Sequence, residues 1–72
     1  MIDRSDPLID RLIQRLDARD PAGRRNAAGA LRLHGARAVG AIPALVRLLA
    51  DEDDCVRNEA RRALERIRRA VA

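Results

Sequence analysis

The sequence has no Phe, Tyr or Trp, no Lys and a single Cys, and each of these absences narrows what the chain can be. Without aromatic side chains, a hydrophobic core has to be built from Leu, Ile, Val and the many Ala residues, which suit closely packed helices. The lone Cys55 has no partner for an internal disulfide. Because a chain of this size buries only about 60% of its unfolded surface, we predict one small domain of modest stability.

Long apolar runs are also missing. No stretch approaches the roughly 20 apolar residues that cross a bilayer, and residues 1–6 contain no apolar run of the kind found in signal peptides. We therefore expect a cytoplasmic protein with no membrane partner.

All fifteen basic residues are Arg, and eleven interspersed acidic residues leave a net charge of +4. This balance permits contact with nucleic acid or with an acidic protein surface and does not distinguish between them.

The first half of the chain predicts two helices. Asp6–Pro7 and Asp20–Pro21 are typical helix starts, since Asp accepts hydrogen bonds from free amides and Pro fits the first helical position. After the first start, apolar residues recur at helical spacing; they are Leu8, Ile9, Leu12, Ile13 and Leu16. The second helix is expected to end near Gly35, a residue type favoured at helix C-termini.

The second half predicts two more helices, which gives an all-α protein of four helices. Residues 36–41 are interpreted as a linker or a single turn, followed by a third helix from about Ile42 to Ala50. The acidic run 51–54 suits the start of a fourth helix, because negative charge is favourable there. The apolar face expected for that helix consists of Val56, Ala60, Ala63, Leu64 and Ile67.

The two halves of the sequence resemble each other when one is shifted by 33 residues. Over residues 12–31 and 45–64 this shift gives seven identities in twenty positions, with no gap. The identical positions include Leu31 with Leu64 and Arg24 with Arg57, which a helical hairpin would bury or use near its turn. Self-similarity at a fixed spacing is typical of stacked repeats.

The repeat resembles a HEAT repeat, and is most similar to the short bacterial subclass named after phycobilisome lyases. The resemblance covers about residues 8–67 and is carried by the pattern Asp-x-x-x-Arg-x-x-Ala-x-x-Ala-Leu at 53–64. Tetratricopeptide repeats would need aromatic residues, and ankyrin repeats a Thr-Pro-Leu-His turn; neither is present. The resemblance implies an α-solenoid of two helical hairpins with right-handed superhelical stacking. Residues 1–72 then form one domain, with repeats at about 6–35 and 36–70.

The resemblance also implies roles for charged residues. In HEAT proteins, matching Asp and Arg residues form a ladder between stacked repeats; the corresponding positions here are Asp20, Arg24, Asp53 and Arg57. The second helix of each hairpin lines the usual binding surface. The residues on that surface are expected to be Arg25, Arg32, Asn58, Arg61, Arg62, Glu65 and Arg69. They predict a non-catalytic scaffold that binds a protein partner. The alternative is a solvated face without a partner, on which Glu65 pairs with Arg61 and Arg69.

Two other functions remain open. A nucleic-acid-binding role is possible for an Arg-rich face, although stacking aromatics are absent and residues 51–54 are acidic. A role as an accessory factor for bilin attachment rests on the subclass name alone. No catalytic, metal or cofactor site is predicted. His34 is the single histidine and has no ligands at metal-site spacing, and Cys55 has no recognisable oxyanion loop or orienting group.

Two repeats leave no residues for separate polar caps at the ends of the stack. Repeat arrays normally need such caps, so apolar side chains are expected at the outer faces. The candidates are Ile2, Leu8 and Ile9 at one end, and Ile67 and Val71 at the other. We therefore predict self-association as a homodimer or larger stack.

Gly23 stands where the second repeat has Val56, which predicts looser packing at the start of the second helix.

Overall fold

The computed structural model describes residues 6–72, and all of its regular elements are helical. They are α1 (Pro7–Arg15), α2 (Pro21–His34), the 3-10 helix η1 (Gly35–Ala41), α3 (Ile42–Leu48) and α4 (Asp54–Val71). The prediction of an all-α protein is therefore confirmed for this part of the chain. Ile2, which was expected at an exposed end, lies outside the described residues.

Asp side chains begin two of these helices. The carboxylate of Asp6 accepts hydrogen bonds from the amides of Leu8 and Ile9 at the start of α1. Asp53 accepts one from the amide of Val56, 3.0 Å away, at the start of α4. The guanidinium of Arg37 in η1 also donates to Asp6, and this bond holds the pKa of the Asp6 carboxyl below its ordinary value. Asp20 precedes α2 without forming a side-chain cap bond.

The expectation of four separate helices joined by linkers needs correction. From residue 21 to residue 48 one helix follows another without an intervening loop, with non-helical torsion angles at Gly35 and Ala38, so the described chain has three helical stretches, 7–15, 21–48 and 54–71. Residues 36–41, expected as a linker or single turn, belong to η1. The chain changes direction at Gly35, whose φ of 59° and ψ of −126° are not helical and form a conformation open to glycine. Ala38 and Ala41 of η1 are fully buried.

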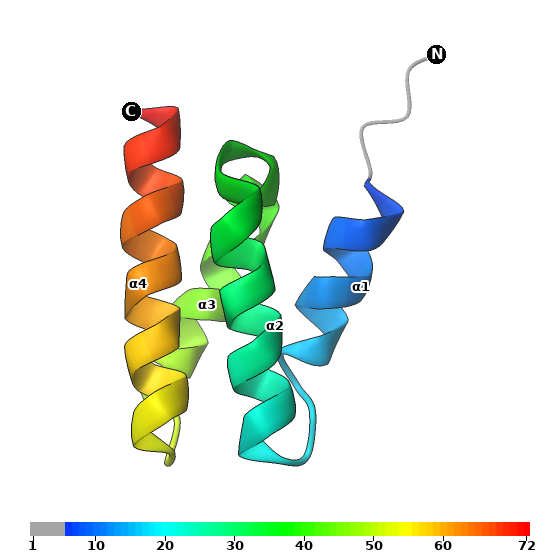
Figure 1. Ribbon diagram of the computed structural model, residues 1–72, viewed down its shortest axis with the longest axis vertical. Coiled ribbons are helices and arrows are strands. Elements are labelled where there is room, and N and C mark those ends of the chain that lie inside the picture. Colours follow the sequence, from blue (N-terminus) through cyan, green and yellow to red (C-terminus); the bar gives the residue numbers. More distant parts are fainter. Residues whose placement is uncertain (1–5) are drawn as a thin grey trace.

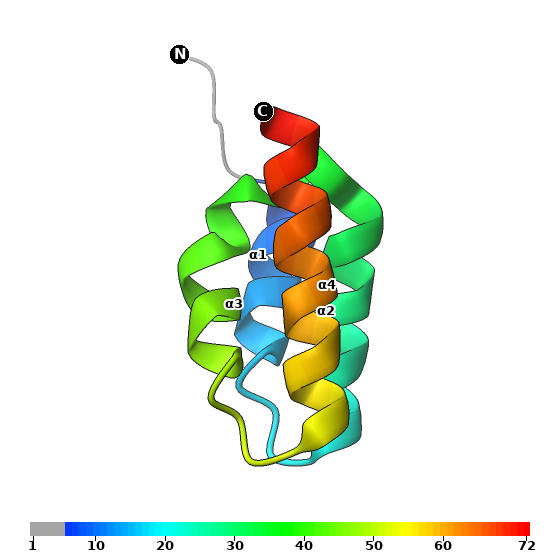
Figure 2. The same ribbon diagram turned by 90° about the vertical axis from the view of Figure 1, so that its left-hand side faces the viewer.

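The helices form two neighbouring hairpins. Helices α2 and α4 lie side by side along most of their length, α1 packs on the far side of α2, and α3 lies beside α4 (Figures 1 and 2). One continuous core joins them, and Leu12, Ile13 and Ile42 pack at its edge. The core consists of Ile9, Leu16, Ala27, Ala28, Leu31, Ala38, Ala41, Ala44, Leu45, Leu48, Val56, Ala60, Ala63, Leu64 and Ile67.

The ends of the molecule differ from the sequence-based expectation. Ile9 and Ile67 were expected to be exposed, and both are buried in the core. Leu8 and Val71 are about half exposed, as expected of end residues. The pattern of apolar residues identified the apolar face of each helix correctly. It could not tell which residues of that face are covered by a neighbouring helix and which remain exposed.

Gly23 is also packed differently from the prediction. It is buried, and a Cβ atom placed on it would lie 2.8 Å from the Cβ of Ala18 and 2.9 Å from Oδ1 of Asp20. The start of α2 is therefore tightly enclosed by the preceding turn. The missing side chain lets the turn approach the helix closely, a role that Val at the matching position 56 does not play.

Candidate functional site: an arginine-rich helical face

Arg24 connects the two turns at one end of the molecule. Its Nη1 donates to the carbonyl oxygens of Ala18 and Arg19, at 2.8 and 2.9 Å, and so holds the turn before α2. Its Nε and Nη2 lie 2.8 and 3.1 Å from the two carboxylate oxygens of Asp51, in the turn before α4. With side chains only 11% and 9% exposed, this two-point ion pair is largely shielded from water. It therefore ties the first hairpin to the second.

We expect Asp51→Asn to lower the melting temperature at neutral pH, because it removes the charge that faces Arg24 and keeps the oxygen that accepts from the amide of Asp53. Burial raises the pKa of Asp51, but the Asp53 amide and Arg24 outweigh it, so the pKa lies below the ordinary 3.8. The carboxylate therefore stabilises the fold above pH 3.8, and this contribution disappears as pH falls through the folded pKa.

The measurement is thermal unfolding by circular dichroism over a pH series. The matched control is Asp54→Asn, because Asp54 pairs with Arg57 but is 85% exposed, where ion pairs contribute little. The Asp51→Asn deficit should shrink at acid pH, and the control should stay close to wild type. Equal effects of the two variants at pH 7 would contradict the role given to Asp51.

The other ladder residues of the sequence-based prediction are placed differently. Asp53 caps α4, and the ion pair of Arg24 is made with Asp51 instead. Nη1 of Arg57 donates to the carbonyl of Asp51, which matches the bond of Arg24 to Ala18 one repeat earlier. The carboxylate next to Arg57 comes from Asp54 of its own helix. In the described residues, the ladder contact between the hairpins is thus made by Arg24 with Asp51.

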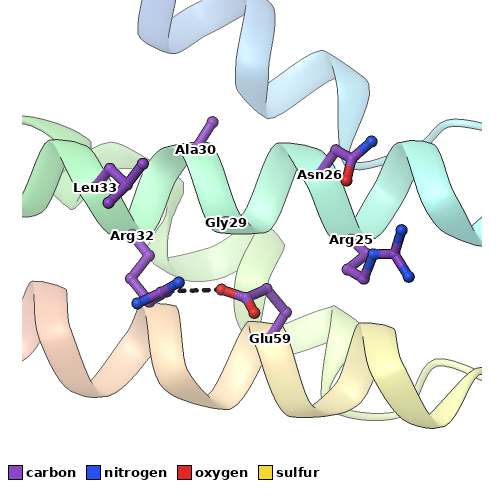
Figure 3. Close-up of a pocket in the computed structure, with 7 residues that line it drawn as sticks. All are labelled: Arg25, Asn26, Gly29, Ala30, Arg32, Leu33 and Glu59. Carbon is purple, nitrogen blue, oxygen red and sulfur yellow. Dashed lines mark hydrogen bonds and ion pairs between the residues drawn. The ribbon is translucent and has the colours of Figure 1, made fainter.

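A second ion pair crosses between α2 and α4. Nε of Arg32 donates to the carboxylate of Glu59 at 2.7 Å, as Figure 3 shows. This contact lines a hollow of about 400 Å³ between the two helices. Arg32 was predicted to bind a partner, but its charge is already matched within the fold. Arg25 and the exposed Leu33 line the same hollow.

The densest group of arginines surrounds a neighbouring hollow of about 290 Å³. Its lining combines part of the predicted face with one residue that sequence reasoning missed, Arg66; the full set is Arg32, Arg62, Glu65, Arg66 and Arg69. Within residues 6–72, Arg62, Arg66 and Arg69 form no ion pair. They follow one another at helical spacing along α4, so three guanidinium groups face one open surface. We call this set of three the arginine triplet.

The remaining predicted residues pair among themselves. Nη2 of Arg61 donates to the side-chain oxygen of Asn58 at 3.0 Å, and its Nη1 lies 3.6 Å from the carboxylate of Glu65. Both ion-pairing side chains are more than half exposed, so this pair contributes little to stability. The predicted face thus divides into a matched edge at Asn58 and Arg61 and an unmatched hollow at the arginine triplet. His34 is half-buried and Cys55 is exposed, and neither lines the two hollows.

The acidic partners Asp51 and Glu59 were also missed from the sequence. Arg24 with Asp51 and Arg32 with Glu59 are two of the ion pairs between the repeats, and each joins residues 27 positions apart. A search for Arg followed by a carboxylate at a constant separation somewhat shorter than the repeat would have found them. Identity at the 33-residue shift could not, because the two partners occupy different positions within their repeats.

Comparison with known proteins gives one match. No curated protein and no solved structure matches the chain. None of the helices in residues 6–72 combines the length and the apolar character needed to cross a membrane. The family described as HEAT repeats matches residues 9–72, which include all of α2, η1, α3 and α4. The paired helices, the repeated sequence and this match together place the chain in the HEAT-repeat family.

Proposed function

We propose that this protein is a non-catalytic scaffold that binds an acidic segment of a protein partner through the arginine triplet, Arg62, Arg66 and Arg69. The observation that carries the proposal is the open hollow on α4, where these three guanidinium groups form no ion pair with any carboxylate of residues 6–72. HEAT repeats commonly serve as protein-interaction scaffolds, and this supports a binding role for the helical surface.

The electrostatics of the hollow favour an anionic partner. Arg32 and Glu65 contribute to its lining but are matched by Glu59 and Arg61, so they add little net charge. Arg presents a planar fork of donors that fits a carboxylate with two parallel hydrogen bonds. A rigid helix that holds three such forks at successive turns suits a partner with several acidic residues along an extended or helical segment.

The test is affinity capture from the source cell followed by mass spectrometry, with wild-type protein and the double variant Arg62→Glu, Arg66→Glu as baits. We expect the variant to lose proteins that the wild type retains, because like charges now face the acidic partner. The matched control is Arg19→Glu, Arg47→Glu, which changes the net charge equally at two exposed arginines outside the hollow. Equal capture by all three baits would overturn the proposal.

Nucleic acid is the second candidate ligand, because the same three guanidinium groups could contact successive phosphates. Repeating the capture after nuclease treatment separates the two functions, since a protein partner survives this treatment and nucleic-acid-mediated capture does not. Retention on DNA that falls steeply with salt would favour the second candidate. Membership of the phycobilisome-lyase subclass and a role in bilin attachment stay predictions, which co-purification with a visible chromophore would support.

A further inference from the structure

The hollow of about 400 Å³ and the hollow of the arginine triplet lie on one continuous face, because Arg32 lines both. We call the first of them the α2 hollow. Helices α2 and α4 run side by side in the same direction (Figure 1), so positions 33 residues apart take the same place on the two helices. By this shift Gly29 corresponds to Arg62, and Leu33 corresponds to Arg66. The α2 half of the face is therefore small and apolar where the α4 half is basic.

Gly29 leaves the α2 hollow open, although the fold does not require a glycine there. An added Cβ would come no closer than 3.5 Å to another atom, Oε2 of Glu59, which is ordinary van der Waals contact. The φ of Gly29 is not positive, and glycine inside a helix lowers helix stability relative to every residue except proline. At Gly23, by contrast, an added Cβ would lie 2.8 Å from the preceding turn. Gly29 thus provides space at the surface and serves no internal contact.

The α2 hollow also carries the most exposed large apolar side chain of residues 6–72. Leu33 is 76% exposed, and Figure 3 shows Gly29 between Leu33 and Arg25 along α2. The ion pair between Arg32 and Glu59 bounds the hollow on the side of α4 and adds little net charge. Unmatched charge on this face is therefore concentrated at the arginine triplet, and the surface around Gly29 and Leu33 favours an apolar group.

We propose that the partner segment is amphipathic and combines its acidic residues with an apolar anchor. Its acidic side chains bind the arginine triplet, and the anchor, a large aliphatic or aromatic side chain, fills the α2 hollow over Gly29 and against Leu33. A purely acidic segment would leave this apolar surface in water. A purely apolar segment would cover guanidinium groups without giving them a partner. This inference rests on the proposed function and adds the anchor to it.

Selection from a random-peptide display library tests the anchor, with the full chain as bait. We expect wild-type protein to enrich sequences that join several acidic residues to a large apolar residue. With Gly29→Gln as bait, the acidic enrichment should persist and the apolar enrichment should disappear, because the Gln side chain occupies the hollow. This variant keeps the fold, since Gln is a better helix former than Gly and the added Cβ meets no close atom. The matched control is Gly40→Gln, because Gly40 is exposed in η1 and lines neither hollow.

The outcomes of this selection separate the anchor from the proposed function. Acidic sequences without a recurring apolar residue, or apolar enrichment that survives in Gly29→Gln, would overturn the anchor and leave the proposed function in place. The double variant Arg62→Glu, Arg66→Glu should lose the acidic enrichment. If the double variant kept it, or if wild-type protein enriched no acidic sequence, the anchor and the proposed function would both fall.

The size of the effect follows from fluorescence anisotropy with one selected peptide. Replacing its apolar anchor by Ser should weaken binding to wild-type protein at least about tenfold, because the contact with the hollow is lost. The same replacement should weaken binding to Gly29→Gln less than about twofold, because the hollow is already filled there. An equal loss on the two proteins would mean that the anchor binds elsewhere, and would overturn the inference.

Discussion

Leu45→Ala should remove a large share of the protein's free energy of unfolding and give the largest loss of stability of the variants considered. Leu45 is completely buried in the hydrophobic core. Truncating a buried Leu to Ala costs about 3 kcal/mol, since apolar contacts are lost and a cavity remains. The total stability of a domain of this size is roughly 4–10 kcal/mol, so the variant loses a large share of it. No aromatic side chain or disulfide is available to compensate.

Thermal or urea unfolding followed by circular dichroism measures this effect, which should lower the melting temperature by roughly 15 °C. Leu49→Ala is the matched control, because it deletes the same atoms from a neighbouring position that is 42% exposed. Its melting temperature should change by only a few degrees in the monomer. If both variants lost the same stability, the assignment of Leu45 to the core and Leu49 to the surface would be wrong.

Gly35→Ala should give the second-largest effect, through the backbone and not through packing. Gly35 is the one residue between 6 and 72 with positive φ, and its ψ of −126° places it in a region that side chains strongly disfavour. The nearest heavy atom to an added Cβ is 3.9 Å away, so the methyl group itself meets no obstacle. The expected loss is therefore about 1–3 kcal/mol of conformational strain, at the point where α2 gives way to η1.

Gly40→Ala is the same chemical change as Gly35→Ala, but we expect it to raise the stability of the protein. Gly40 lies in η1 with no heavy atom within 4 Å of an added Cβ, and its φ is not positive. Replacing a helical Gly by Ala stabilises by roughly 0.5–1 kcal/mol, because the unfolded chain loses freedom. Melting curves of the two variants should therefore shift in opposite directions. A shift of both to higher temperature would show that Gly35 does not set the turn.

The candidate site was predicted from the sequence only in outline. Helical spacing placed Arg62, Glu65 and Arg69 on one side of α4, and the structure brings them around one hollow. Helical spacing did not reveal that Arg32 forms an ion pair with Glu59 or that Arg66 also lines this hollow. Side chains on one helix are ordered by a fixed period, whereas contacts between helices depend on how the helices cross.

The sequence by itself determined the helical class, the starts at Pro7 and Pro21, the end of α2 at Gly35 and the 33-residue repeat. These features depend on local hydrogen bonding, backbone preference and side-chain period, all of which can be read within a few turns of chain. The tertiary structure alone decided that Arg24 meets Asp51, that Ile9 and Ile67 are buried, and that Val46 and Leu49 are exposed. The burial of a residue depends on which helices become its neighbours. An amphipathic sequence pattern is the same whether neighbouring helices cover a helix on one flank or on both, so the pattern alone does not determine burial.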